Sequence, residues 1–223
     1  MIIAIDGPAA SGKSSVAKET AKRLGYKYID TGAMYRAVTW KALKEKIDIT
    51  NEDAVVALAK GSQIDISELK NTHYEVLIDG EDVTEAIRLP KVSAAVSTVA
   101  KVPGVRTALV KKQRSYADIY QNIIIEGRDI GTAVFPEAEL KIFLKASPVE
   151  RAKRRYRELK EKGHKVELSA IERDIVTRDK IDSTRAASPL IKAPDAHVID
   201  TTSKTISQVV QEIINMAKNE LMK

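Results

Sequence analysis

Cysteine is absent from this chain of 223 residues. Its absence excludes disulfide bonds and thiolate metal sites, and makes a cytosolic setting the expected default. The chain also lacks any apolar run near the roughly 20 residues of a membrane-spanning helix, and its first residues lack the basic, apolar and cleavage segments of a signal peptide. We therefore expect a cytoplasmic protein with no membrane partner.

Aromatic residues are scarce, at 4% of the chain, whereas charged residues make up 30% and leave a formal net charge of +6. This positive balance could mark a nucleic-acid surface, basic residues gathered around polyanionic small substrates, or a solvated lysine-rich surface. The few aromatics are not interleaved with basic residues, as a base-stacking platform would require. We therefore expect no nucleic-acid partner and favour small anionic substrates.

Short apolar segments alternate with amphipathic ones along the sequence. This alternation predicts a parallel sheet with helices on both faces, which is an α/β fold. The segment from Ile206 to Leu221 repeats apolar residues at helical spacing and is expected to pack on the sheet. The strands are expected at residues 2–6, 28–30, 122–126, 140–144 and 197–200.

The segment Gly7–Ser14 reads GPAASGKS and matches the spacing G-x-x-x-x-G-K-[ST]. It lies between a strand candidate and a helix candidate, so backbone N–H groups and the helix dipole would converge on a nucleotide phosphate. Lys13 would bridge the β- and γ-phosphates, and the Ser14 hydroxyl would coordinate Mg²⁺. This glycine loop therefore predicts binding of a nucleoside triphosphate, through Gly7, Pro8, Ala9, Ala10, Ser11, Gly12, Lys13, Ser14 and Ser15.

A second strand is expected to end at Asp30, and a second helix to begin directly after it. Thr31 is predicted as the N-cap of that helix, and Arg36 lies about one turn further on. An arginine at this edge of the sheet would suit a second phosphate group, that of an acceptor. A capped helix with a solvent-exposed arginine would give the same pattern, and the sequence alone leaves both interpretations open.

Residues 50–88 interrupt the alternation of strands and helices. A helix is expected over residues 52–60, followed by a polar stretch. Tyr74, Val76 and Ile78 then alternate with other residues before the turn at Asp79-Gly80, which is a hairpin signal. We expect a small antiparallel sheet inserted into the parallel core.

Two basic segments follow later in the chain. The helix expected over Pro148 to Lys162 carries Arg151 and Arg155 on one face, and such like charges repel, which suggests that a polyanion binds there. In the second segment Arg178, Asp182 and Arg185 are spaced i, i+4 and i+7, so they would form one stripe of a helix. The alternatives are a nucleic-acid patch for the first segment and a solvated ion-pair ladder for the second.

Six blocks in order along the chain resemble the bacterial cytidylate kinase family. They are the glycine loop, YIDTGAMYRA at 28–37, EGRDIGTAVFP at 126–136, KIFLKAS at 141–147, ERAKRRY at 150–156 and RDKIDSTRAASPL at 178–190. The resemblance implies a P-loop three-layer fold with a five-stranded parallel sheet flanked by helices, an antiparallel β insert and a helical lid. It also implies phosphoryl transfer from ATP to CMP or dCMP, with Mg²⁺ as cofactor.

The resemblance also implies roles for individual residues. Asp129 would accept from the cytosine amine, as acidic side chains do in nucleic-acid readout, and Arg106 would donate to the ring. Arg128 would hold the acceptor phosphate, although an Arg-Asp ion pair at a strand end remains an alternative. The implied catalytic residues are Lys13, Arg36, Arg128 and Arg178; Arg151 and Arg155 join the ATP site; CMP would contact Thr31, Tyr35, Arg36, Ser97, Arg106, Arg128, Asp129, Arg178, Asp182 and Arg185.

The expected organisation is a single kinase domain over residues 1–223 that acts as a monomer. Its core would span about 1–48, 100–147 and 186–223, its monophosphate-binding lobe about 49–99, and its lid about 148–185. A regulatory GTPase is disfavoured because no Asn/Thr-Lys-x-Asp segment is present to read guanine. A nucleic-acid-binding NTPase stays open, as does a P-loop kinase of small alcohols, in which Asp30 could serve as the base.

Overall fold

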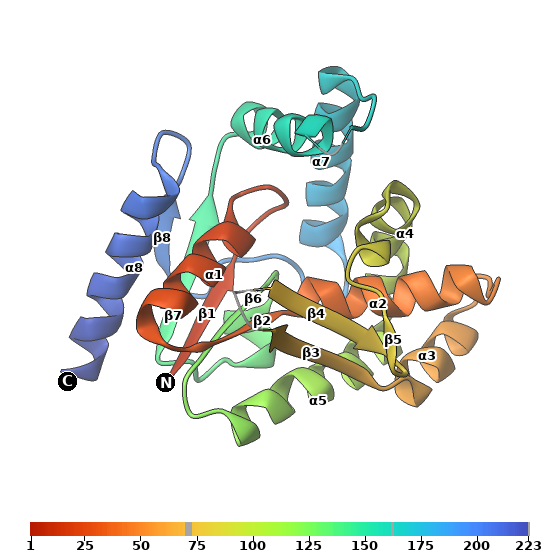
Figure 1. Cartoon of the computed structure of the whole chain (residues 1–223), viewed down its shortest axis with the longest axis horizontal. Helices are drawn as coiled ribbons and strands as arrows, with labels where there is room; N and C mark the ends of the chain where they lie inside the picture. The colour runs from red at the N-terminus through yellow and green to blue at the C-terminus, as the bar shows by residue number, and fades with distance from the viewer. Residues whose placement is uncertain (70–72, 162, 223) are drawn as a thin grey trace. The chain divides into compact units, whose positions relative to one another are not determined.

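The computed structural model describes residues 1–69, 73–161 and 163–222. It divides into two compact units (Figure 1). The first unit comprises Met1–Tyr28 and Gln121–Lys223, and the second unit comprises Ile29–Tyr120. We describe each unit in turn.

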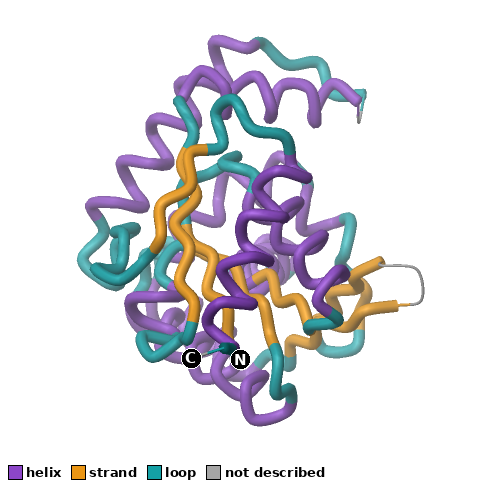
Figure 2. Tube along the Cα trace, turned by 90° about the vertical axis from the view of Figure 1, so that its left-hand side faces the viewer, coloured by secondary structure: helices purple, strands orange, loops and turns teal. Residues whose placement is uncertain are grey.

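A five-stranded parallel sheet organises the first unit. Its strand order is β2-β6-β1-β7-β8, and the strands run side by side in Figure 2. The edge strand β2 continues across the boundary into the second unit at Ile29. The five predicted strands are confirmed, as β1 Ile2–Asp6, β2 Lys27–Asp30, β6 Ile123–Gly127, β7 Leu140–Lys145 and β8 His197–Asp200.

The two neighbouring strands β1 and β6 each contain three consecutive apolar residues that are buried on both faces of the sheet. Ile3, Ala4 and Ile5 of β1 are fully buried, as are the three isoleucines of β6. This is the composition typical of strands inside a parallel sheet. Parallel pairing sets Asp6 opposite Gly127, so the loops that follow β1 and β6 begin side by side. Functional loops gather at this edge of open α/β sheets.

Two helices of the first unit pack together beside the sheet. Helix α1 spans Lys13–Leu24 and contacts β1, β6 and α8, which spans Ile206–Leu221. A capping box between Thr205 and Gln208 begins α8, and the middle of its predicted apolar face is buried, whereas Ile206 and Leu221 at its two ends are exposed. The prediction of a C-terminal helix packed on the sheet is therefore confirmed.

The remaining long helices of the first unit form a hairpin of α6, Pro148–Glu161, and α7, Leu168–Thr184. Ala152, Ile171 and Ile175 form its small apolar core, against which Ala10 of the glycine loop also packs. The basic helix was expected to reach Lys162, which lies outside the described residues. The expectation that Arg185 lies on a helix is wrong, because α7 ends at Thr184 and Arg185 adopts an extended conformation.

The second unit combines helices with a small antiparallel sheet of strand order β3-β4-β5. The predicted hairpin is confirmed, with the Asp79-Gly80 turn joining β4 to β5. The interpretation of residues before it as a polar stretch is wrong, because β3 lies there, and its buried Ile64 and Ile66 alternate with polar residues. The elements are α2 Thr31–Lys44, α3 Glu52–Gly61, β3 Ile64–Leu69, β4 His73–Ile78, β5 Glu81–Asp82, η1 Ala86–Arg88, α4 Pro90–Ala100 and α5 Pro103–Ile119.

Candidate functional site

The glycine loop joins β1 to α1, and its conformation requires both of its glycines. Gly7 has φ +151°, and a Cβ atom there would lie 2.2 Å from the carbonyl oxygen of Leu144. Gly12 has φ +94° and is the N-cap of α1, a left-handed conformation that favours glycine. The backbone therefore wraps the start of α1 closely, as a phosphate-binding loop must.

Lys13 lies at the start of α1 with its side chain buried. Its Nζ atom donates a hydrogen bond to the carbonyl oxygen of Pro8 at 2.7 Å. Burial, together with the charges of Arg128 and Arg178, lowers the pKa of Lys13 well below its ordinary value, whereas Glu126 and Asp6 act in the opposite direction. A bound anion would stabilise the charged ammonium in such surroundings.

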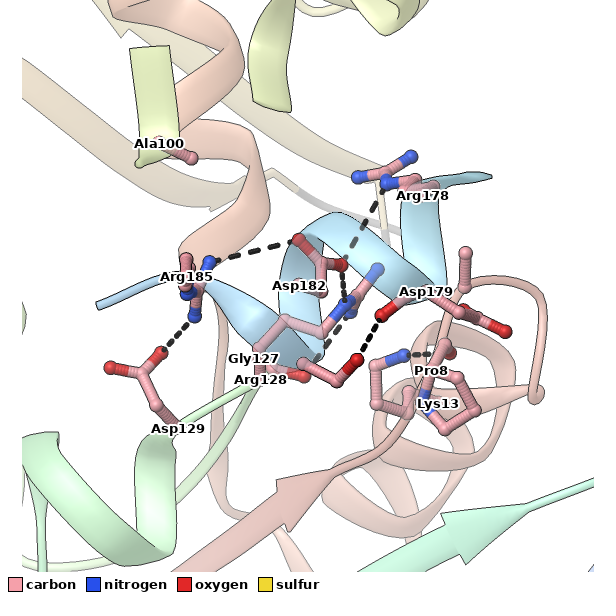
Figure 3. Close-up of polar contacts among 12 residues, drawn as sticks. Pro8, Lys13, Ala100, Gly127, Arg128, Asp129, Arg178, Asp179, Asp182 and Arg185 are labelled. Atoms are coloured by element: carbon pink, nitrogen blue, oxygen red, sulfur yellow. Dashed lines mark hydrogen bonds and ion pairs between the residues drawn. The ribbon is translucent and has the colours of Figure 1, made fainter. Parts of the chain in front are cut away.

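Three arginines converge on the buried carboxylate of Asp182 (Figure 3). Arg128 Nε donates to Asp182 Oδ2 at 2.9 Å, Arg185 Nη1 lies 3.7 Å from Oδ1, and Arg178 Nε lies 3.9 Å from Oδ2. We call Arg128, Arg178, Arg185, Asp129 and Asp182 the arginine cluster. The predicted grouping of Arg178, Asp182 and Arg185 is therefore present, although the segment leaving α7, and not the helix itself, supplies Arg185.

Asp129 completes the arginine cluster. It is buried, and its Oδ1 atom lies 3.6 Å from Arg185 Nη2. The alternative of an ion pair between Arg128 and its neighbour Asp129 is not what the structure shows, because Arg128 pairs with Asp182 and Asp129 pairs with Arg185. Three guanidinium groups against two carboxylates leave the cluster with one excess positive charge, which favours an anionic ligand.

The arginines of α6 have partners of their own. Arg151 is only 4% exposed. It donates to the carbonyl oxygens of Ala146 and Ala9 at 3.1 Å each, and its Nη2 atom lies 2.6 Å from Asp179 Oδ2 on α7. Burial with two carbonyls and a carboxylate makes Arg151 a link between the hairpin and the glycine loop.

The next two arginines of α6 are also paired with carboxylates. Arg154 contacts Glu150 at 3.1 Å and donates to the Thr201 hydroxyl at 2.9 Å, and Arg155 contacts Glu158 at 2.7 Å. Arg151 and Arg155, whose like charges were expected to repel one another, therefore each have a carboxylate partner. The partner of Arg155 lies on the same helix, whereas that of Arg151 lies on α7 and is not revealed by helical spacing.

In the second unit, Asp30 caps α2. Its side chain accepts a hydrogen bond from Ala33 N at 3.0 Å, and Thr31 is the first residue of the helix. The predicted N-cap Thr31 is therefore wrong by one residue, because Asp30 precedes it and aspartate is the stronger N-cap residue. Arg36 Nη2 lies 3.3 Å from Asp30 Oδ2. Arg36 is therefore held at the start of α2 and is not the freely solvated arginine of the alternative interpretation.

Arg106 and Tyr35, both expected near the acceptor base, lie together in the second unit. Arg106 is buried on α5, donates to the carbonyl oxygen of Ala100 at 3.1 Å, and places its guanidinium carbon 5.2 Å from the centroid of the Tyr35 ring. This distance is typical of a cation–π contact. Ser97 lies half-buried on α4.

Two buried carboxylates beside the glycine loop were missed by sequence reasoning. Asp6 accepts hydrogen bonds from Ile130 N and Gly131 N at 2.8 Å each, and burial raises its pKa to about 6. Glu126 accepts a hydrogen bond from the Tyr28 hydroxyl. An acidic residue at the end of a wholly apolar strand was the available signal, since such a position becomes buried when the strand is central in the sheet.

The residues at the glycine loop fit a magnesium ion held mainly by phosphates and water. Ser14 and Ser15 are exposed in the first turn of α1, so their hydroxyl oxygens are accessible. Mg²⁺ prefers oxygen ligands, keeps several waters and commonly binds through substrate phosphates. Over residues 1–69, 73–161 and 163–222, no group of three or more His, Cys, Asp or Glu side chains could hold a metal ion.

Across the part of the chain that the structure describes, no helix has both the length and the apolar character needed to cross a membrane.

Comparison with known proteins identifies the family. A model of the cytidylate kinase family matches residues 3–219. The chain is 52% identical over 216 residues to the cytidylate kinase of Alkaliphilus oremlandii, covering 97% of each. It is 50% identical over 223 residues to that of Bacillus licheniformis, covering 100% of this chain and 98% of the relative. An uncharacterized protein from Eubacterium ventriosum shares only the fold, with a TM-score of 0.53, 12% identity and 97% coverage of both chains. With a family match over nearly its whole length, the chain belongs to the cytidylate kinase family.

Proposed function

We propose that this chain transfers the γ-phosphoryl group of Mg-ATP to the 5′-phosphate of CMP or dCMP, giving ADP and CDP or dCDP. The observation that carries the proposal is the full-length similarity to proteins named cytidylate kinase. The glycine loop and the arginine cluster supply chemistry suited to two phosphorylated substrates.

The glycine loop would hold the triphosphate. Its backbone N–H groups and the N-terminus of α1 would surround the β-phosphate, and Lys13 would exchange its hydrogen bond to Pro8 for phosphate oxygens. Ser14 would hold the magnesium ion together with phosphates and water. Bound Mg²⁺ would neutralise charge on the transferring group.

Arginines would hold the acceptor. Arg128 and Arg178 would contact its phosphate, and Arg36 would approach it from α2. Asp182 would then accept from the ribose hydroxyls as its pairing with Arg128 loosens. Asp129 would accept from the cytosine amine and Arg106 would donate to the ring acceptors, a complementary pair that uracil does not match. Tyr35, Thr31 and Ser97 would complete the pocket.

In the reaction an acceptor phosphate oxygen forms a bond to the γ-phosphorus while the bond to the β–γ bridging oxygen breaks. The acceptor oxygen is already ionised at neutral pH, so no strong general base is needed. The work of the protein is alignment of the two phosphates and stabilisation of the spreading negative charge. Lys13, Arg36, Arg128 and Arg178 would share that work, and closure would exclude water as a competing acceptor.

The proposed lobe and lid keep the ranges expected from the sequence. Within one kinase domain, residues from about 49 to 99 would form the monophosphate-binding lobe, and residues from about 148 to 185 would form the lid. Arg155 of the lid, whose partner Glu158 is 44% exposed, would turn toward the triphosphate, whereas Arg151 would act where it lies, beside Ala9. We further propose a monomer that works in the cytoplasm, where both nucleotide substrates are present.

Rival functions have weaker support. A kinase of alcohols would need Asp30 as its base, but both Asp30 oxygens are engaged, by Ala33 N and by Arg36. A nucleic-acid-binding NTPase would use the basic residues of α6, but three of them, Arg151, Arg154 and Arg155, are each paired with a carboxylate.

A coupled assay of ADP formation across CMP, dCMP, UMP, AMP, GMP and dTMP tests the proposal. CMP and dCMP should give the highest kcat/KM. A higher kcat/KM for AMP, GMP or dTMP would refute it.

A further inference from the structure

Asp6 is the last residue of β1 and immediately precedes Gly7 of the glycine loop. It is only 4% exposed. Its Oδ1 atom accepts a hydrogen bond from Ile130 N and its Oδ2 atom one from Gly131 N, each at 2.8 Å. These N–H groups begin η2, a π-helical turn over Ile130–Val134 that follows directly after Arg128 and Asp129.

The space around Gly131 allows this contact. A Cβ atom on Gly131 would lie 3.5 Å from Asp6 Oδ2, an ordinary van der Waals distance, and 3.1 Å from Cδ of the Lys141 side chain, so the close neighbour of Gly131 is Lys141. The carbonyl oxygen of Asp129 accepts from Ala133 N at 2.8 Å and from Val134 N at 3.1 Å. The backbone of Asp129 is therefore part of the same turn that Asp6 holds.

We infer that Asp6 is a positioning residue that fixes η2, and through it Arg128 and Asp129, relative to the glycine loop. This inference rests on the proposed roles of Arg128 and Asp129 in binding CMP. A buried carboxylate is costly unless its hydrogen bonds are strong, and two hydrogen bonds from adjacent backbone N–H groups are charge-assisted. The phosphate loop and the acceptor-binding turn thereby share one side chain.

Asparagine has the shape of aspartate but can accept from only one of the two N–H groups, because its amide nitrogen faces the other. Asp6→Asn should therefore loosen η2 while β1 stays in place. We expect the KM for CMP to rise on the order of 10-fold, as when outer groups that orient ligands are removed, with the KM for ATP within about twofold. The ratio of kcat/KM for CMP over UMP should fall as well, because Asp129 lies on the loosened segment.

The matched control is Glu139→Gln. Glu139 also accepts a backbone hydrogen bond from β1, from Ile2 N at 2.7 Å, but at the opposite end of the strand. Glu139→Gln should leave the KM for CMP, the KM for ATP and the CMP/UMP ratio of kcat/KM unchanged. An equal rise of both KM values in Asp6→Asn, or a lower melting temperature with unchanged KM and selectivity, would overturn the inference.

Asp129→Ala separates this inference from the proposed function. If Asp129→Ala lowers the CMP/UMP ratio and Asp6→Asn does not, the positioning role fails while base reading by Asp129 stands. If Asp129→Ala leaves the ratio unchanged, the proposed base reading itself fails. Should Asp6→Asn not fold, Asp6→Glu keeps the carboxylate but moves it by one methylene group relative to Ile130 N and Gly131 N. It should raise the KM for CMP selectively, and no selective rise there would equally overturn the inference.

Discussion

Asp182→Asn removes the central negative charge of the arginine cluster while keeping the shape of the side chain. The wild-type cluster sets three guanidinium groups against two carboxylates, and the variant sets three against one. The Asp182 side chain is 6% exposed, so loss of its negative charge leaves positive charge on the arginines that water solvates poorly. Removing one partner of a buried ion pair costs about 3–5 kcal/mol. The remaining amide oxygen still accepts from Arg128, and Arg178 is partly solvated, so we expect about 2–3 kcal/mol.

Thermal unfolding measures this effect. A loss of about 2–3 kcal/mol in a chain of this length lowers Tm by roughly 5–10 °C. Because the variant has one more excess positive charge, added sulfate should raise its Tm more than that of wild type.

Glu158→Gln is the matched control, because it removes a carboxylate that lies 2.7 Å from Arg155 but is 44% exposed. Surface pairs contribute about 0–1 kcal/mol, so its Tm should change little. If Tm falls by the same amount in both variants, or if sulfate raises the Tm of Asp182→Asn no more than that of wild type, the burial of an excess positive charge does not cause the loss of stability.

Four further predictions follow from the site. Burial raises the pKa of Asp6 from 3.8 to about 6, so the folded state binds its proton more tightly: the contribution of Asp6 to stability is greatest below pH 3.8 and falls by about 3 kcal/mol as the pH rises through 6. Urea unfolding should show Asp6→Asn gaining stability relative to wild type by that amount over this window, and a constant difference would contradict the raised pKa. Gly7→Ala, whose Cβ would lie 2.2 Å from the Leu144 carbonyl oxygen, should lower kcat/KM for ATP about 100-fold, whereas Gly61→Ala, with open space around its Cβ, should not; equal kinetics in the two variants would count against the loop geometry. Asp129→Ala should lower the CMP/UMP ratio of kcat/KM about 10-fold, which the six-nucleotide assay measures. Chelation of Mg²⁺ should abolish turnover and leave CMP binding by calorimetry intact; turnover in excess chelator would contradict a role for the metal.

The parts of the fold that were predictable are those that neighbouring residues determine. The isoleucines at 123–125 identify a strand buried on both faces whatever its partners are, and the Asp79-Gly80 turn predicts its hairpin locally. Strand β3 was missed because only Ile64 and Ile66 of its first residues are apolar, and its pairing with β4 was not visible in composition. Thr31 was predicted as the N-cap because Asp30 was assigned to the end of the preceding strand, whereas Asp30 both ends β2 and caps α2.

The candidate site was predictable where one motif carries the chemistry, as in the glycine loop, and where family motifs name the residues. It was not predictable where a contact joins remote segments. Arg151 meets Asp179 across the hairpin, and Asp6 meets Ile130 across 124 positions of sequence. Neither pairing follows from local spacing, because the packing of α6 on α7 creates the first and the parallel register of β1 with β6 creates the second.

The hydrogen bonds of Arg151 have a mechanical consequence. This one side chain holds the carbonyl oxygen of Ala9 and the carboxylate of Asp179 at once. The hairpin of α6 and α7 is therefore not mechanically independent of the glycine loop. A displacement of α7 would either break the ion pair between Arg151 and Asp179 or move the backbone at Ala9 as well. If α6 and α7 act as the proposed lid, their movement would therefore change the conformation of the glycine loop as well.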